Sequence, residues 1–349
     1  MPNHKALFLQ SKCGAWEVAE QETRKPGPGE LLVRIEACGL NPIEWKIHTY
    51  GSAGPVPKSY PTVLGSDIAG VVEEVGEGVS GFAKGDRVVY QGAFENDKAG
   101  YQHYGIANVE FVAKIPSNLS FDEAATLPVA IATVATGFYG SKPHGAGLTL
   151  PVDEAGKGKY SGKPLLIIGG ASSLGQSAIQ FACLSGFFPI LTTASPSNAG
   201  LLKSLGATHV FDRNLSTADL TAQVAEAIGD APLELVFDTI SAPPTQQAGY
   251  DLLSEGGHLI IVVPEMLKPV EGRNVTYSMV HGIWGTPFNV EIGRELHKHM
   301  TALLADGSIK PNRVEVLPGG LRGVFGGLER LKAGSVSGTK LIAHPHETD

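Results

Sequence analysis

A glycine-rich turn between an apolar run and a helical pattern is the segment of this sequence best suited to binding chemistry. It reads Gly-Gly-Ala-Ser-Ser-Leu-Gly and follows the apolar residues 165–168. Glycines let backbone N–H groups approach a pyrophosphate, and the amino end of the following helix presents a favourable dipole to its negative charge. The pattern GGxxxxG is looser than Gly-x-Gly-x-x-Gly, so a tight turn without a ligand is the alternative. The residues predicted to bind a dinucleotide here are Gly169, Gly170, Ala171, Ser172, Ser173 and Leu174.

The residues about twenty positions further on bear on which dinucleotide would bind. An enzyme that prefers NAD places an Asp or Glu there against the ribose 2′-hydroxyl, but this chain has Ala-Ser-Pro-Ser-Asn at residues 194–198. Hydroxyl and amide groups without a carboxylate favour the 2′-phosphate of NADPH, and we predict contacts from Ser195 and Asn198. Arg213 could supply the positive charge, or it could be an ordinary solvated surface arginine.

The elements around these residues predict an α/β fold with two kinds of domain. Short β-rich runs broken by Gly and Pro over residues 5–112 indicate a partly open all-β barrel. Residues 121–140 look like a helix entering a second domain, and residues 141–163 look like a surface loop. From residue 164 strands and helices alternate, which predicts a parallel, doubly wound sheet. The predicted boundaries are an N-terminal domain over 1–125, a dinucleotide-binding domain over 126–300, and a return segment over 301–349 that completes the first domain.

Composition excludes several classes of partner. The 349 residues carry a formal net charge of −8, which argues against nucleic acid or an anionic membrane surface and favours small molecules. Three separated cysteines support neither a disulfide framework nor a cysteine-rich metal site, and they fit a reducing compartment. The first ten residues lack an apolar signal core, and no apolar run has the length of a bilayer span. We therefore expect a cytoplasmic protein, or one whose organelle address has been removed.

Five segments together resemble one family over nearly the whole chain: ACGLNPIEWK, LGSDIAGVVEEVGEGVSGFAKGDRV, LPVAIAT, IGGASSLG and SGTKL. They are similar to the medium-chain dehydrogenases/reductases. The resemblance implies a GroES-like N-terminal barrel, a Rossmann domain and an active-site cleft between them. Where the zinc-dependent members have a Cys-His pair this chain has Asn41-Pro42, and Ser66 replaces the His of their Gly-His-Glu. The four-cysteine lobe expected near residues 91–103 is also absent, so no metal is expected.

Within that family the chain resembles quinone oxidoreductases and, more closely, the fungal trans-acting enoyl reductases that serve polyketide synthases. The shared features are Asn-Pro-x-x-x-Lys, a long connector before the nucleotide-binding strand, and Ser-Pro-x-Asn. One departure is Arg213, because the subgroup often has Tyr at this position. The resemblance assigns Lys46 to the nicotinamide ribose or the substrate enolate, and Thr133 to the carboxamide. The alternatives are a solvated Lys46 at the barrel rim and a Thr133 that caps a helix or fills a core. Further cofactor contacts are expected from Asn41, Val262, Val263, Ser337, Gly338 and Lys340.

Without a metal to polarise a simple carbonyl, reduction of a conjugated double bond by hydride from NADPH is the predicted reaction. Three hypotheses stay open: an enoyl reductase, a quinone or general alkenal reductase, and a non-catalytic NADPH-binding protein. Residues 277–289 are predicted to form an apolar pocket wall after the last Rossmann strands, with a dimer interface as the alternative. The expected substrate is an enone or enoyl thioester, free or held on an acyl carrier of a polyketide synthase, and the chain is either a monomer or a homodimer.

Overall fold

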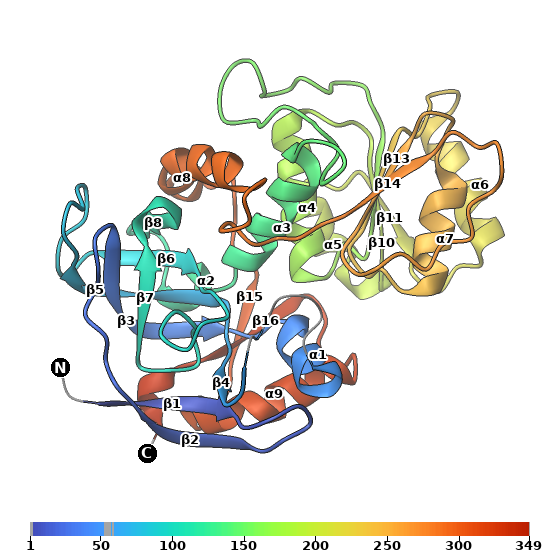
Figure 1. Cartoon of the computed structure of the whole chain (residues 1–349). Coiled ribbons are helices and arrows are strands. Elements are labelled where there is room, and N and C mark those ends of the chain that lie inside the picture. Colours follow the sequence, from blue (N-terminus) through green and yellow to red (C-terminus); the bar gives the residue numbers. More distant parts are fainter. Residues whose placement is uncertain (1–2, 52–56, 58, 349) are drawn as a thin grey trace. The chain divides into compact units, whose positions relative to one another are not determined.

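The computed structural model describes residues 3–51, 57 and 59–348, and it divides into two compact units. Unit 1 comprises Met1–Val129, Met300–Ala305 and Pro311–Asp349, and unit 2 comprises Ala130–His299 and Asp306–Lys310 (Figure 1). Most of the C-terminal segment therefore belongs to unit 1. No helix in the described ranges is long and apolar enough to cross a membrane.

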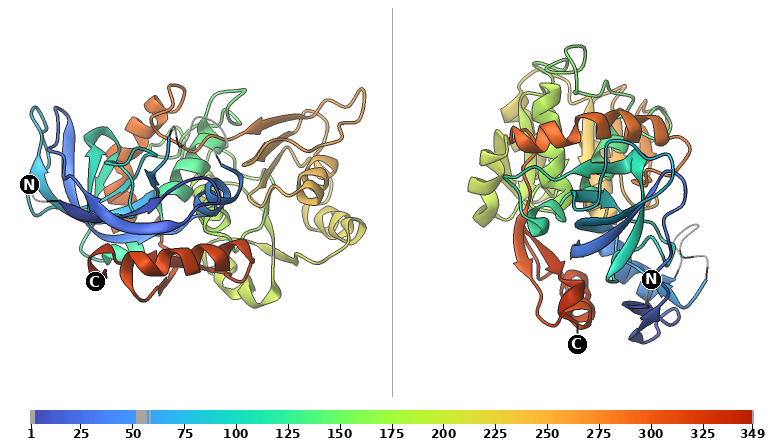
Figure 2. Two further views of the ribbon diagram at one scale, coloured as in Figure 1. Left: turned by 60° about the horizontal axis from the view of Figure 1, so that its bottom comes forward. Right: turned by 90° about the vertical axis from the view of Figure 1, so that its left-hand side faces the viewer.

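Unit 1 is built on two sheets. The larger has the order β15-β16-β3-β5-β6-β8 with β7 paired to β3, and the smaller has the order β2-β1-β4. The strands are β1 (His4–Leu9), β2 (Trp16–Gln21), β3 (Glu30–Gly39), β4 (Thr62–Val63), β5 (Asp67–Val75), β6 (Arg87–Gln91), β7 (Tyr104–Asn108), β8 (Val112–Lys114), β15 (Arg313–Val316) and β16 (Thr339–Ala343). The α-helices are α1 (Pro42–Tyr50), α2 (Phe121–Ala124) and α9 (Gly323–Lys332). Figure 2 shows α9, in red, lying alongside β1 and β2, in blue.

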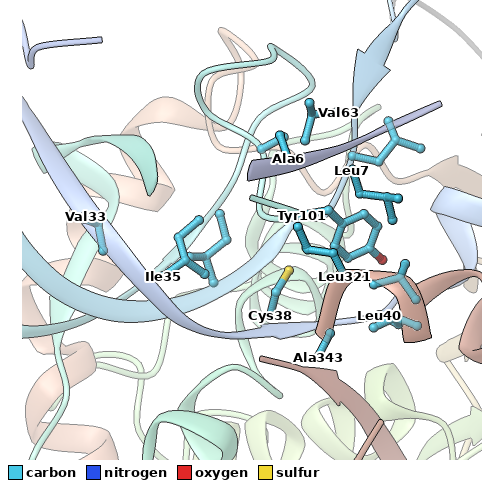
Figure 3. Close-up of a cluster of buried hydrophobic side chains, with 14 of the residues drawn as sticks. Ala6, Leu7, Val33, Ile35, Cys38, Leu40, Val63, Tyr101, Leu321 and Ala343 are labelled. Carbon is cyan, nitrogen blue, oxygen red and sulfur yellow. The ribbon is translucent and has the colours of Figure 1, made fainter. Parts of the chain in front are cut away.

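The core of unit 1 joins residues from both ends of the chain. Ile35 and Cys38 of β3 pack in one cluster with Leu321 and Ala343 of the return segment, and all four are fully buried (Figure 3). Burying apolar surface contributes about 25 cal/mol per Å², so this cluster binds the return segment firmly to the barrel. The sequence predicts an all-β barrel for this part of the chain. The structure differs, because helices α1 and α9 pack on each other beside the sheets.

Unit 2 contains a sheet of six parallel strands in the order β11-β10-β9-β12-β13-β14. They are β9 (Leu165–Ile168), β10 (Ile190–Ala194), β11 (His209–Asp212), β12 (Leu235–Asp238), β13 (His258–Ile261) and β14 (Thr276–Met279). In chain order this is 3-2-1-4-5-6, the doubly wound dinucleotide-binding arrangement, so the predicted fold class is confirmed. Figure 1 shows α3 and α4 on one side of the strands and α6 and α7 on the other. The helices are α3 (Pro128–Tyr139), α4 (Ser173–Ser185), α5 (Ala199–Ser204), α6 (Thr217–Ile228), α7 (Pro243–Leu252) and α8 (Val290–Ala305), the last of which continues into unit 1.

Two predicted elements differ from the structure. Residues 121–140 form two helices because Pro128 has no N–H for a continuing helix; it begins α3 instead. The predicted pocket segment 277–289 does not lie after the last strand, since it begins inside β14.

The connector 141–163 contains turns without a helix or a strand, and the Tyr160 ring stacks on Phe187 with 5.0 Å between ring centroids.

Candidate active site

The glycine-rich turn connects β9 to α4 at the middle of the parallel sheet. Gly169 has φ +84°, and a methyl group added at Gly170 would overlap the Thr192 hydroxyl. The Ser172 hydroxyl caps α4 by accepting the N–H of Gly175 at 2.9 Å. The N–H groups of Ser173 and Leu174 lie in the first helical turn, where no earlier helical carbonyl is available to them. The N–H groups of Gly169, Gly170 and Ser172 donate to acceptors within the protein. The donors at this turn suited to an anion are therefore those of Ser173 and Leu174 at the amino end of α4, and cofactor contact by the six predicted residues stays a prediction.

This turn lies at the switch point of the sheet, where the strand order reverses between β9 and β12. The Thr239 hydroxyl, just after β12, donates to the Ile168 carbonyl at 2.7 Å and lies 3.1 Å from the Ser172 hydroxyl. These contacts tie together the carboxyl ends of the two strands that border the switch point. Ligands of doubly wound sheets bind at this place.

Ser195 and Arg213 are neighbours at the same edge of the sheet. The parallel strands β10 and β11 pair Ala194 with Asp212. Ser195 directly follows the first and Arg213 the second, and the Arg213 N–H donates to the Ala194 carbonyl at 2.9 Å. The Arg213 side chain is exposed and has no ion-pair partner within the described ranges. Asn198 is 8% exposed, so its side chain is far less available to a ligand than that of Ser195. The structure thus brings together a hydroxyl and a free guanidinium.

Strand β13 and helix α3 of unit 2 position three more predicted residues: Val262, Val263 and Thr133. The two valines follow β13 directly and are half-buried, and the Val262 N–H donates to the Ser241 hydroxyl at 2.9 Å. Thr133 is half-buried on α3 and packs against Gly282, where an added methyl group would overlap the Thr133 hydroxyl. The segment 277–289 therefore reaches Thr133, and its contact with the cofactor or the substrate stays a prediction.

The same segment contributes Pro287 and Phe288 to a pocket of about 600 Å³. Tyr139, Ser141 and the first turn of α8 complete its lining. The Phe288 ring stacks on His144 with 3.8 Å between ring centroids. This pocket is mixed in character, because Glu291 and Arg294 lie beside the apolar residues, and its use as a substrate site stays a prediction.

Lys46 lies on α1 of unit 1, at the middle of that helix. It is half-buried, and its Nζ atom lies 5.8 Å from the centroid of the Trp45 ring. Burial lowers the pKa of the Lys46 ammonium. Among the residues that the structure describes, no carboxylate pairs with Lys46. Lys46 is thus half-buried beside the Trp45 ring, and its contact with the nicotinamide ribose or the enolate stays a prediction.

Asn41 and Lys340 are brought together with Asp67 in a buried cluster. The Lys340 ammonium lies 2.6 Å from both Asp67 Oδ2 and Asn41 Oδ1, and the Asn41 amide donates to Asp67 Oδ2 at 2.9 Å. The second Asp67 oxygen accepts the N–H of Val129 at 2.6 Å. Asn41 is 5% exposed and Lys340 is 3% exposed. These partners lie within the protein, so cofactor contact by Asn41 and Lys340 stays a prediction, as it does for exposed Ser337 and buried Gly338.

Glu44 adjoins this cluster through its hydrogen bond with the Asn41 backbone. Its carboxylate accepts the N–H of Asn41 at 2.5 Å, and it is fully buried. Burial raises the pKa of Glu44 to about 8, against the opposing effect of Lys340. The environment of Glu44 thus favours its neutral form, and the ion pair of the cluster joins Lys340 to Asp67.

Comparisons with known proteins were consistent with this architecture. Residues 27–130 match the alcohol dehydrogenase GroES-like domain, and residues 173–286 match the zinc-binding dehydrogenase domain. The chain is 34% identical over 337 residues to the trans-enoyl reductase resD of Aspergillus sclerotiorum, covering 90% of this chain and 92% of the relative. It is 33% identical to the trans-enoyl reductase tndF of Aspergillus flavipes, covering 97% and 98%. This chain belongs to the medium-chain dehydrogenase/reductase family.

Solved structures of this family share the fold over nearly all of the chain. The CurK enoyl reductase matches with a TM-score of 0.77 at 22% identity, covering 98% of this chain and 99% of that one. A quinone oxidoreductase of Pseudomonas syringae matches with a TM-score of 0.76 at 24% identity, covering 97% and 99%. The resemblance predicted from the sequence, including that to the trans-enoyl reductases, is confirmed.

The medium-chain dehydrogenase/reductase family includes zinc-binding members, but the residues of this chain do not fit a zinc ion. Zinc takes thiolate, imidazole and carboxylate donors, whereas this site offers the Asn41 amide, the Ser66 hydroxyl and a carboxylate already paired with the Lys340 ammonium. Elsewhere in the described part of the chain, no group of three or more His, Cys, Asp or Glu side chains could hold a metal.

Four residues with buried or half-buried hydrogen bonds, one in unit 1 and three in unit 2, were not predicted from the sequence as functional. Asp67 stands in Gly65-Ser66-Asp67, where the zinc-dependent members have Gly-His-Glu, and neither it nor Thr239, Asp238 and Ser241 was singled out as functional. The last three lie in FDTIS, which begins at the end of an apolar strand and runs into the following turn, so its place at the carboxyl end of a strand of the Rossmann sheet was the available signal.

Proposed function

We propose that this chain reduces an activated carbon–carbon double bond by hydride transfer from NADPH, without a metal. The observation that carries the proposal is the dinucleotide-binding turn at the switch point, followed at the end of the next strand by Ser195 beside Arg213 and no carboxylate at the Ser195 position. A guanidinium and a hydroxyl complement a phosphate, whereas a carboxylate would repel it. The relatives named trans-enoyl reductases support the reaction class.

The candidate site offers no set of zinc donors, so the substrate must be one that can be reduced without a metal. A conjugated alkene carries its own electron sink, so hydride can reach the β carbon while hydrogen bonds hold the developing enolate. We assign that hydrogen bond, or one to the nicotinamide ribose, to Lys46, and a contact with the carboxamide to Thr133. When bound, NADPH supplies the hydride. The chain's own residues hold the cofactor and exclude water.

The substrate class we propose is an enone or an enoyl thioester, with a carrier domain of a polyketide synthase as the donor of the thioester. A panel of enals, enones, quinones and enoyl thioesters assayed by NADPH consumption tests this proposal. The panel is run with protein dialysed against a chelator, and activity should be retained. Reduction of quinones alone would favour a quinone reductase, and NADPH binding without turnover would favour a non-catalytic protein.

Removing the Arg213 guanidinium should change cofactor preference. Arg213→Ala is expected to weaken NADPH binding about tenfold or more, the scale of a lost charge-assisted hydrogen bond, and to leave NADH binding unchanged. Equilibrium titration of both cofactors by fluorescence measures the change. Arg313→Ala, at an exposed arginine of unit 1, is the matched control. An unchanged preference for NADPH in Arg213→Ala would make Arg213 an ordinary surface residue.

A further inference from the structure

Ser241 has an unusual backbone conformation at the switch point of unit 2. Its φ is +53°, and within the described ranges Cys13 is the other non-glycine residue with positive φ. L residues avoid this left-handed region because Cβ crowds the backbone, and they keep it where the surrounding structure enforces it. Glycine would adopt the same conformation without strain, so the serine side chain must contribute something at this position.

The Ser241 hydroxyl bridges the carboxyl ends of two strands. It donates to the Asp238 carbonyl at 2.7 Å and accepts the Val262 N–H at 2.9 Å. Asp238 is the last residue of β12, and Val262 directly follows β13. Ser241 is 1% exposed, so both hydrogen bonds are shielded from water. Neither glycine nor alanine could make this bridge.

Asp238 holds the turn in which Ser241 lies. Its Oδ1 atom accepts the N–H groups of Ser241 at 2.8 Å and Ile240 at 3.0 Å. Its Oδ2 atom is buried, and the Thr245 hydroxyl, which donates to the Ala242 carbonyl at 3.0 Å, also lowers the pKa of the Asp238 carboxyl. Burial raises the pKa of Asp238 to about 6. The protein therefore retains a carboxylate in an unfavourable environment to fix the conformation of this turn.

In a sheet of this topology the two halves bind different halves of the dinucleotide. The half formed by β9, β10 and β11 begins with the glycine-rich turn and ends at Ser195 and Arg213, the proposed 2′-phosphate site. The half formed by β12, β13 and β14 is left for the nicotinamide nucleotide. The Ser241 bridge lies wholly within this second half, and it fixes the backbone at Val262.

We propose that Ser241 is a positioning residue for the nicotinamide: its hydroxyl, held by the Asp238 turn, sets the backbone at Val262 against which the nicotinamide nucleotide binds. The inference rests on the proposed function, because it presumes a dinucleotide with its nicotinamide in this half of the sheet. Ser241 itself touches neither the cofactor nor the substrate.

The test compares two ligands that differ by the nicotinamide half. Ser241→Ala and Ser241→Gly should weaken NADPH binding about five- to tenfold, the scale of one lost buried hydrogen bond, and leave the affinity for 2′,5′-ADP unchanged. Both affinities are measured by calorimetry, which needs no substrate. Ser241→Cys, which keeps a weak hydrogen-bonding group without a β-branch, should lose less NADPH affinity than Ser241→Ala. Cys13→Gly, at the other left-handed residue, should change neither affinity.

Selective loss of NADPH affinity in the alanine and glycine variants supports the proposal. Equal loss for both ligands would show that the bridge only stabilises unit 2, and no loss for either would show that the bridge is idle; each result overturns the proposal. If Ser241→Ala does not fold, the two affinities are measured on Ser241→Gly instead. A failure of the proposed function is seen separately, as wild-type protein that binds NADPH but reduces no conjugated substrate.

Discussion

Lys340→Met is expected to lower the free energy of unfolding by about 3–5 kcal/mol, because removing one partner of a buried ion pair leaves the other charge uncompensated. Lys340 and Asp67 are 3% and 0% exposed, and the Lys340 ammonium also satisfies Asn41 Oδ1. Urea denaturation at pH 7 measures the loss. Lys332→Met, at an exposed lysine on α9, removes the same charge from unit 1 and should change stability by less than about 0.5 kcal/mol.

A second variant separates the ion pair from simple packing. Lys340→Met combined with Asp67→Asn removes both charges, so a large part of the lost stability should return. A double variant no more stable than Lys340→Met would mean that the methylene groups of Lys340, rather than its charge, hold the cluster. A single variant as stable as the wild-type chain would contradict the account of this cluster altogether.

Lys46→Ala is expected to lower kcat/KM about 100-fold, the scale of one charge-assisted contact in a sheltered site, while stability stays nearly unchanged. The two expectations differ because Lys46 has no carboxylate partner among the described residues, and so no ion pair is lost with it. Burial lowers the pKa of Lys46, and lysine is charged only below its pKa. As the pH rises, Lys46 should therefore lose its charge at a lower pH than an exposed lysine would. Activity that depends on this charge should fall over that lower pH range.

The control for this variant is Lys25→Ala, which removes an exposed lysine of unit 1. Its kinetic constants should match those of the wild-type chain. Lys46→Arg keeps the charge and should retain part of the activity. If Lys46→Ala reduces a conjugated substrate at the wild-type rate, Lys46 is a solvated lysine and another group must hold the enolate or the ribose.

Local sequence patterns predicted much of unit 2. The strands predicted to alternate with helices from residue 164 correspond to β9–β13, because each is a short apolar or β-branched run beside turn or helix signals. β14 was missed because Thr276–Met279 is four residues long and mixes polar with apolar side chains. α1 was missed because its nine residues lie between strands and show little separation of polar and apolar faces.

The contacts of the site could not be predicted in the same way. Lys340 and Asn41 are 299 residues apart, and pairing at that separation depends on how the return segment closes unit 1. The left-handed backbone of Ser241 is enforced by its tertiary contacts, since the serine residue itself disfavours it. Glycines and turns were predictable because their requirements are local, whereas the buried hydrogen bonds depend on segments that meet only in the folded chain.

The central claim is hydride transfer from NADPH to a conjugated double bond without a metal, and an isotope experiment tests it most directly. Protein dialysed against a chelator is given NADPH deuterated at C4 of the nicotinamide and an α,β-unsaturated thioester. We predict a saturated product with one deuterium at the β carbon, found by mass spectrometry and NMR. Oxidation of simple alcohols by this protein, with no deuterium transferred to any enal, enone, quinone or enoyl thioester, would contradict the account.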